Sequence, residues 1–537
     1  MPDTHTHLPA DTNQALGIAA YAIEFMKAGK PDQAVLDKTT LFNTDAAICG
    51  LSALALGTNA PTILRNEALQ YATPDGDLGP GLGNCKHHGA TVFGSQQRVK
   101  SEKAILANCA AVREWDSNGT NFGYDPERGN TAGEFGHNDF YAVPLAAAQM
   151  LGADGATALK GMVLHDEIRG RLAEVFSLKT YKVDHVLHGG IASAATFGAM
   201  VGATPEQIES AIGMVVAHAV PFRAIRAGKQ LSDSKGSSAA ITTEFAITAV
   251  KRSMAGFLGP RDIFRNPEAI FRIFEGPGQM FKAVNATEAN TTQADASPFD
   301  LHLGMTGTDF AVMGMHFKLG LYEHQSAGAI QAVIDLIANS PTLLDDANGG
   351  SIKSIRVVAY EPAFGIIGDP AKRNPTTRQS ADHSMVYIIA TLLRKALDKR
   401  AAAETFAWND LMLEPADYAA DAINNTRTRS IMDKIEFAHG GPDYDAKYPD
   451  GIPTSVIITD HTGASHDSGL VMYPTGHARN TTADLDAALA HKFDLLGRLA
   501  FNDPSPIIDR FNRIASLTAD EIQTINDDEF TVAGSFE

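Results

Sequence analysis

Cysteine is scarce in this sequence. Its 537 residues include three cysteines, Cys49, Cys85 and Cys109, which lie far apart and form no Cys-x-x-Cys pair. An odd and sparse set does not build the disulfide framework of a secreted scaffold, and it is typical of a reducing compartment. The same spacing argues against a cysteine-ligated iron–sulfur cluster. We therefore expect free thiols and a cytoplasmic location.

Long apolar runs and an excess of positive charge are absent as well. No run approaches the length of a membrane-spanning helix, and the first residues lack the basic and apolar regions of a signal peptide. The 44 Lys and Arg residues stand against 63 Asp and Glu, which gives a formal net charge of −19. Such a surface repels nucleic acids and anionic lipids. We expect neither as a partner, so an anionic ligand would need a local cluster of basic residues.

Common catalytic motifs are missing too. The sequence has no His-Glu-x-x-His and no Gly-x-Ser-x-Gly, which argues against the commonest zinc proteases and serine hydrolases. Two histidines three residues apart, His185 and His188, are weak evidence for zinc without further ligands. The glycines of residues 79–83 faintly resemble a phosphate-binding loop, but no strand precedes them. The residues themselves therefore indicate neither a metal site nor a nucleotide site.

The apolar residues that are present recur at helical spacing through the first half of the chain. Small residues dominate these segments, as in closely packed helices, and Thr204-Pro-Glu-Gln207 is a capping box that opens another helix. The predicted helices cover residues 15–28, 41–56, 101–113, 143–151 and 157–173.

The pattern changes after Phe281, where a polar run over residues 285–297 precedes mixed elements. Helical spacing continues at 326–338 and 383–395, whereas residues 355–360, 431–437 and 455–459 indicate strands. A second capping box, Thr518-Ala-Asp-Glu521, returns the tail to helix.

A chain of this length is too long for one core. We expect a mainly α fold with an α+β part. A large helical domain would form from both chain ends, residues 1–284 and 481–537, with a smaller α+β lid domain inserted at 285–480.

One polar loop, residues 223–240, runs directly into a predicted helix. Lys235 falls in or just before the first turn, where the positive end of the helix dipole disfavours a cation. Together with Arg226, Lys229 and unpaired backbone N–H groups, it makes a place that attracts an anion. A solvated basic loop is the alternative that this segment alone leaves open.

Four more polar groups fall at predicted element ends. Asp116 follows an amphipathic helix, His137 precedes one, and Lys318 flanks a short apolar run. Tyr387 lies four residues after His383, which would place both on one helical face. Histidine is the usual acid or base near neutral pH. Taken singly, each of these residues also fits an ordinary structural role.

Seven segments follow one another along the chain in a fixed order. They are Leu41-Phe-Asn-Thr-Asp-Ala-Ala-Ile-Cys49, Arg113-Glu-Trp-Asp116, Gly136-His137, Asp184-His185-Val-Leu-His188, Ser234-Lys235-Gly236, Lys318-Leu-Gly-Leu-Tyr-Glu-His324 and Asp382-His383-Ser-Met-Val-Tyr387. Taken in order, these segments resemble the MmgE/PrpD family, which contains 2-methylcitrate dehydratases, cis-aconitate decarboxylases and iminodisuccinate epimerases. The resemblance extends from about residue 15 to about residue 480.

The resemblance implies a helical domain with an α+β lid, a homodimer, and an active site between the domains that needs no metal or organic cofactor. By position it assigns five catalytic residues, Asp116, His137, Lys235, Lys318 and Tyr387. Further contacts to substrate are expected from Arg226, His185 and His324. The loop between Asp116 and His137 is longer than in the family, and the Lys318 segment lacks its usual proline-containing turn.

The family's chemistry acts on small di- and tricarboxylates at a carbon beside a carboxylate. Proton removal there builds a dianionic, enediolate-like species that needs nearby cations in a water-poor cleft. Lys235, Lys318 and Arg226 are the expected cations, and His137 is the expected proton carrier. The leading hypothesis is dehydration of 2-methylcitrate to 2-methylaconitate. Decarboxylation of cis-aconitate, epimerisation of a dicarboxylate, and carboxylate binding without turnover are the alternatives.

Overall fold

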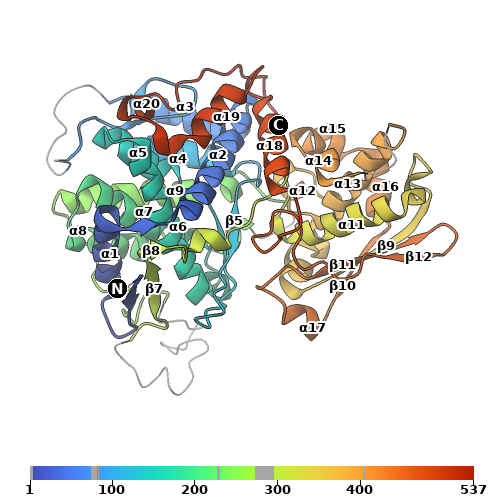
Figure 1. The fold of residues 1–537 in the computed structure, drawn as a ribbon, viewed down its shortest axis with the longest axis horizontal. Coiled ribbons are helices and arrows are strands. Elements are labelled where there is room, and N and C mark those ends of the chain that lie inside the picture. Colours follow the sequence, from blue (N-terminus) through green and yellow to red (C-terminus); the bar gives the residue numbers. More distant parts are fainter. Residues whose placement is uncertain are drawn as a thin grey trace.

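The helices predicted from residue spacing form the larger of two lobes in the computed structural model (Figure 1), which describes residues 4–73, 82, 84–226, 230–271, 296–402 and 406–536. Their boundaries follow the capping signals, because Asn13 accepts from the first turn of α1 and Thr204 forms the expected capping box with Gln207. The long helices are α1 Gln14–Ala28, α2 Gln33–Ala55, α3 Asn59–Leu69, α4 Ser101–Arg113, α5 Ala142–Leu151, α6 Gly155–Val175, α7 Val186–Val201, α8 Pro205–His218 and α9 Ser234–Met254.

The C-terminal tail returns to this lobe. Helices α18 (Leu485–Gly497) and α19 (Ser505–Asn512) pack against α2, and α20 (Ala519–Gln523) opens with the second capping box and packs against α5. Both chain ends therefore contribute to one helical body, and the mainly α fold class is confirmed.

The smaller lobe is built on a four-stranded sheet of order β10-β9-β11-β12. Strand β9 (Ile352–Ala359) pairs in parallel with β10 (Ile435–His439) and antiparallel with β11 (Thr454–Asp460), which continues into β12 (Ser465–Asp467). Helices pack around it, the longest being α11 Ala327–Asn339, α13 Met385–Lys399 and α16 Thr426–Met432; the short ones are α12 Arg378–Ala381, α14 Trp408–Leu411, α15 Ala420–Ile423 and α17 Pro442–Asp445.

Several local predictions differ from the structure; the helix predicted at 41–56, for example, already begins at Gln33. The segment expected as a strand at 431–437 begins as the end of α16, and the strand starts only at Ile435. Helix α13 begins at Met385, because Ser384 caps it, so His383 precedes the helix and does not share a helical face with Tyr387. The capping serine in the sequence was the signal for this boundary.

Short strand pairs join distant segments in the larger lobe. Strand β7 (Leu301–Gly304) pairs with β1 (His5–Leu8), and β8 (Thr306–Gly307) pairs with β2 (Lys30–Pro31), so residues 301–307 contact the N-terminal segment. The expected domain boundary at residue 285 lies outside the described residues, as do most of the glycine loop at 79–83 and Lys229. Strands β3 (Ala90–Thr91) and β4 (Arg98–Val99) form a further small pair.

Within the residues that the structure describes, no single helix combines the length and apolarity needed to cross a membrane, although α2 and α3, bent by 91° relative to each other, pass that test as a pair.

A buried lysine from the returning tail ties α18 to the middle of the chain. The Lys492 ammonium is fully buried and lies 2.5 Å from an Asp45 carboxylate oxygen on α2. It also donates to the carbonyl oxygens of Ser117, at 2.6 Å, and Lys318, at 2.7 Å. These two backbone segments carry the polar cluster described below, so Lys492 fixes their separation.

Replacing Lys492 by methionine is expected to lower the free energy of unfolding by about 3–5 kcal/mol, because it strands the buried Asp45 carboxylate. Denaturant unfolding measures this loss. The double variant Asp45→Leu with Lys492→Met should recover part of it, since no charge then remains unpaired. Lys27→Met, at an exposed lysine, is the matched control and should change stability by less than about 0.5 kcal/mol. A loss below about 1 kcal/mol for Lys492→Met would contradict the structural role.

Candidate active site

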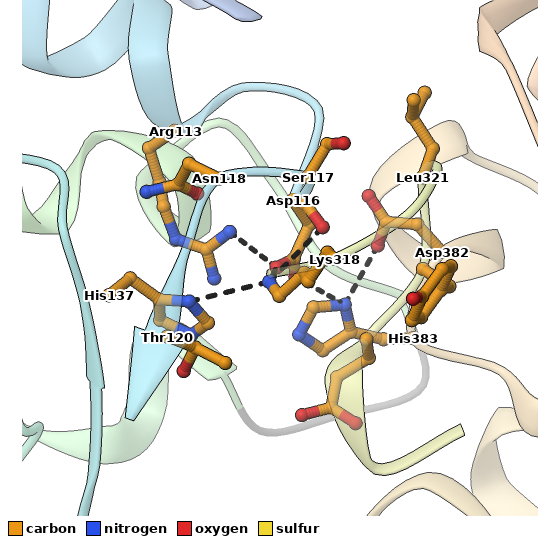
Figure 2. A network of polar contacts seen from close by, with 12 residues as sticks. Arg113, Asp116, Ser117, Asn118, Thr120, His137, Lys318, Leu321, Asp382 and His383 are labelled. Atoms are coloured by element: carbon orange, nitrogen blue, oxygen red, sulfur yellow. Dashed lines mark hydrogen bonds and ion pairs between the residues drawn. The ribbon is translucent and has the colours of Figure 1, made fainter. Parts of the chain in front are cut away.

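The Asp116 carboxylate lies at the centre of a buried polar cluster (Figure 2). It follows the end of α4 in the left-handed region, with φ of 51°, and its side chain is fully buried. Arg113, one helical turn earlier, lies 2.5 Å from Oδ1, and the Lys318 ammonium pairs with the same oxygen. Lys235 and His383 approach Oδ2 at 3.4 Å and 3.2 Å. Four chain segments thus converge on one carboxylate.

Burial and charge shift the acidities in this cluster. Burial alone would raise the pKa of Asp116, but Arg113, Lys318 and Lys235 together hold it well below its usual range, so the carboxylate is ionised. Burial lowers the pKa of Lys318 to about 8, although Asp116 opposes the shift. An ammonium with that pKa can release a proton near neutral pH, which an ordinary lysine cannot do.

His137 reaches the cluster from a small hairpin. Strands β5 (Thr120–Phe122) and β6 (Phe135–His137) pair antiparallel, and Thr120 exchanges two backbone hydrogen bonds with His316, which places Lys318 alongside. At Gly136 a Cβ atom would meet a guanidinium nitrogen of Arg169 at 2.3 Å, so the position has no room for a side chain. The hairpin is thereby packed tightly against α6.

The contact between His137 and Lys318 fixes the tautomer of the imidazole. The Lys318 ammonium lies 3.3 Å from Nδ1 of His137. Burial, followed by the charges of Arg113 and Lys318, lowers the pKa of His137 well below its usual range, so the ring is neutral. Because Nδ1 accepts from Lys318, the ring proton lies on Nε2. His137 can therefore pass a proton from Lys318 to a group at Nε2.

The smaller lobe contributes Asp382 and His383, which sequence analysis did not assign as site residues. Nδ1 of His383 lies 2.8 Å from Oδ1 of Asp382, and the Lys235 ammonium lies 2.8 Å from the same oxygen. Burial and the Lys235 charge lower the pKa of His383 to about 3. Nδ1 of this neutral ring donates to the Asp382 carboxylate, which leaves the Nε2 lone pair free to accept a proton. The two histidines thus present opposite tautomers.

The three residues expected to bind substrate differ in their distance from the cluster and in their hydrogen-bond partners. His185 is buried beside His137, with ring centroids 5.4 Å apart. Arg226 lies 2.5 Å from Asp184 and is therefore already paired with a buried carboxylate. His324 is buried behind Lys318, stacked on His316 at 5.3 Å, and neither of its ring nitrogens has a hydrogen-bond partner among the described residues.

Tyr387 is the predicted catalytic residue that the structure does not bring to the cluster. Its hydroxyl donates to the Asp417 carbonyl oxygen at 2.6 Å, and its ring packs on Tyr418 with centroids 5.7 Å apart. Both contacts lie inside the smaller lobe. The physical reason is the helix boundary, because α13 starts after His383 and directs Tyr387 into the lobe's own core. We therefore replace Tyr387 by His383 in the candidate site.

The sequence carried partial signals for the missed residues. Arg113 lies three residues before Asp116 on the predicted helix, the spacing at which side chains on a helix meet. Asp382 and His383 belong to one of the segments that resemble the family, but the helix predicted at 383–395 included His383, whereas α13 begins at Met385.

The same cluster contains a geometry that could hold a metal ion. Ligand atoms of Asp116, Asp382 and His383 all lie within 4.8 Å of one another. The Lys235 ammonium, however, contacts both carboxylates at 3.4 Å and 2.8 Å, so a positive charge already lies between them. A divalent cation there would meet strong repulsion from Lys235. This donor set does not fit a metal in the present arrangement.

Glu323 is a titratable group at the junction of the lobes. Its backbone N–H donates to the Asp382 carbonyl oxygen at 2.8 Å, and its carboxylate accepts from the Gln325 N–H at 2.9 Å. Burial, reinforced by the Asp116 charge, raises the pKa of Glu323 from 4.5 to about 7. The fold thus favours the protonated acid over the carboxylate at this position.

Glu323→Gln is expected to remove a pH dependence of stability. The pKa of the folded state lies above that of the unfolded chain, so this stabilisation is full below pH 4.5 and is lost as the pH rises through about 7. The wild type should therefore lose stability relative to the variant over this window, which thermal unfolding midpoints across the range would show. Glu24→Gln on the exposed side of α1 is the control. Parallel pH profiles for wild type and Glu323→Gln would contradict the raised pKa.

Known proteins show the same family relationship along the chain. The model of the MmgE/PrpD N-terminal domain matches residues 17–281, and that of the MmgE/PrpD C-terminal domain matches residues 323–505. A 2-methylcitrate dehydratase of Salmonella typhi is 24% identical over 80% of this chain and 82% of its own length. The 2-methylcitrate dehydratases of Escherichia coli (strain K12) and Cupriavidus necator are 24% and 23% identical, each over 77% of this chain and 79% of their own lengths. The chain belongs to the MmgE/PrpD family.

Proposed function

We propose that this chain is a cofactor-independent lyase that dehydrates a small tricarboxylate, most specifically 2-methylcitrate to 2-methylaconitate. The observation that carries the proposal is the buried cation cluster around Asp116, flanked by two neutral histidines of opposite tautomer. Such a cluster stabilises negative charge that develops on a carboxylate. The relatives named 2-methylcitrate dehydratase support the choice of substrate.

The proton leaves the substrate carbon toward His383. Nε2 of this ring accepts the proton from the carbon beside a carboxylate, and Nδ1 stays hydrogen-bonded to Asp382, with an Asp116 oxygen 3.2 Å away. A bound substrate adds negative charge near the ring, which raises its pKa and makes it a stronger base. The enediolate-like charge that forms is stabilised by Lys235 and Lys318.

The hydroxyl group leaves with a proton that comes from Lys318. Nε2–H of His137 donates to the departing oxygen while Nδ1 takes a proton from the Lys318 ammonium, whose lowered pKa favours the transfer. The hydroxyl departs as water and the carbon–carbon double bond forms. Asp116 contacts both His383 and Lys318, so it links the group that gained a proton to the group that lost one. Proton return along this line resets the site.

A homodimer in the cytoplasm is the assembly and location that we infer for this enzyme. Large apolar side chains are exposed on α9 and just after it, at Ile241, Phe257 and Leu258, the last with 78% of its surface accessible. Phe257 and Leu258 are adjacent in the chain, and exposed apolar side chains that gather in one place favour a contact surface.

The function is tested by assaying purified protein with 2-methylcitrate, citrate and cis-aconitate, each before and after dialysis against a chelator. A conjugated double bond formed from 2-methylcitrate, at a rate that the chelator leaves unchanged, is the expected result because Lys235 occupies the only candidate metal position among the described residues. Ultraviolet absorbance and product mass provide the measurement. Activity that disappears on dialysis and returns with a divalent ion would overturn the cofactor-free mechanism, and carbon dioxide release from cis-aconitate would identify a decarboxylase.

Substitution of the two histidines separates them from Tyr387. His137→Ala and His383→Ala should each lower turnover by about a hundredfold or more, as expected when a proton-transfer group is lost. Tyr387→Phe should keep a rate near that of the wild type and lose about 1 kcal/mol of stability, because it removes only the hydrogen bond to Asp417. Steady-state kinetics and thermal unfolding on all three variants give both readouts. A severe loss of turnover in Tyr387→Phe with near-normal rates in His383→Ala would reverse the assignment.

A further inference from the structure

The charges of the central cluster are already matched within the protein. Four cationic side chains pair with four carboxylates, and every one of these groups is buried. The cations are Arg113, Lys235, Lys318 and Arg378, and the carboxylates are Asp116, Asp382, Glu114 and Asp139. A substrate with three carboxylates therefore meets a neutral cluster and needs further positive charge nearby.

Two more cations lie close to this cluster without a carboxylate partner. Lys372, at the end of the short helix Pro370–Lys372 in the smaller lobe, is 9% exposed, and its ammonium makes no hydrogen bond or ion pair with the residues that the structure describes. Arg223, in the short helix Arg223–Arg226 of the larger lobe, has a guanidinium nitrogen, Nη1, that is buried without a partner in the same part of the chain. Buried charged atoms normally have partners, so the Lys372 ammonium and the Nη1 atom of the partly exposed Arg223 favour an anionic ligand.

Segments next to the two cations are hydrogen-bonded to each other across the lobe junction. Gln230 donates to the Asn374 carbonyl oxygen at 3.2 Å, and Lys372 lies two residues before Asn374. Further along, the Lys235 ammonium reaches Asp382. On the larger lobe, the short helix that contains Arg223 is held near the cluster because its Arg226 pairs with Asp184, whose neighbour His185 lies beside His137.

The electrostatics agree with this placement. Burial is the main cause that lowers the pKa of Lys372; Glu323 opposes the shift, and the positive charges of Lys235 and, more weakly, Arg223 add to it. The charges of both cations therefore act on this lysine. The acid that acts on it most strongly is Glu323, with a weaker effect from Asp369, and the pKa of Glu323 is itself raised to about 7, so at neutral pH that acid is only partly ionised.

We propose that Arg223 and Lys372 form a carboxylate-binding subsite at the lobe junction, which holds a carboxylate of the substrate remote from the reacting carbon. Each lobe supplies one cation, so the subsite is complete only when both lobes meet around the ligand. Its ligand class is a tricarboxylate, since the carboxylate at the reacting carbon is met by Lys235 and Lys318. The subsite makes Arg223 and Lys372 determinants of specificity, and it rests on the proposed function of the central cluster.

Binding of an inert substrate analogue tests the subsite directly. Propane-1,2,3-tricarboxylate has no hydroxyl to lose, and glutarate is the matched dicarboxylate. Binding of both ligands is measured by calorimetry on the wild type, Lys372→Met and Arg223→Met. The wild type should bind the tricarboxylate more tightly than glutarate. Each variant should bind it about tenfold to a hundredfold more weakly, the loss of one charge-assisted contact, while glutarate binding changes little. With 2-methylcitrate, each variant should raise KM more than it lowers kcat.

A matched control removes an exposed charge elsewhere on the smaller lobe. Lys353→Met on β9 should leave both affinities unchanged, and thermal unfolding confirms that each variant is folded. The subsite is wrong if the wild type binds the tricarboxylate and both variants keep that affinity. It is also wrong if the variants lose as much affinity for glutarate as for the tricarboxylate. In both cases the proposed function stands. If the wild type binds no tricarboxylate, the proposed function and the subsite both fail.

Discussion

The buried carboxylate of Asp116 is the constraint around which both lobes are arranged. An isolated charge in a protein interior is very unfavourable, so its cations must be close and well oriented. Its cations come from α4, α9 and the segment before α11, and the neutral His383 approaches it from the turn before α13 in the smaller lobe. Removing any one of these cations leaves the remaining charges unmatched. The site and the relative position of the lobes are therefore stabilised by the same interactions.

This arrangement also explains how the site can move protons with ordinary side chains. Asp116 contacts His383 through one oxygen and Lys318 through the other. His383 keeps its proton on Nδ1, which donates to Asp382 beside Asp116, whereas Lys318 donates to Nδ1 of His137 and leaves the proton of that ring on Nε2. One histidine is set to accept a proton and the other to deliver one. Two neighbouring carboxylates and one lysine thus fix the opposite roles of two chemically identical rings.

Sequence patterns predicted the helices well and the site only in part. Helical spacing and capping boxes depend on residues that are close in the sequence. Helix α4 and the starts of α8 and α20 could therefore be located from local signals. Asp116, His137, Lys235 and Lys318 were assigned by resemblance, and the structure brings them together. Tyr387 was misplaced because one capping residue, Ser384, shifts the start of α13. Whether a lysine is paired, as Lys235 is, or unpaired, as Lys372 is, depends on contacts between distant segments, which local patterns do not encode.

Matched and unmatched charges have different consequences for specificity. The groups around Asp116 are neutral in sum, so they can serve any substrate that loses a proton beside a carboxylate, and they do not distinguish two carboxylates from three. Cations without a partner among the described residues do distinguish them, because the burial of such a charge stays unfavourable until an anion binds to it. With Arg223 on one lobe and Lys372 on the other, the missing anion is also the contact that completes the junction. Recognition of the substrate and closure of the site around it would then be the same event.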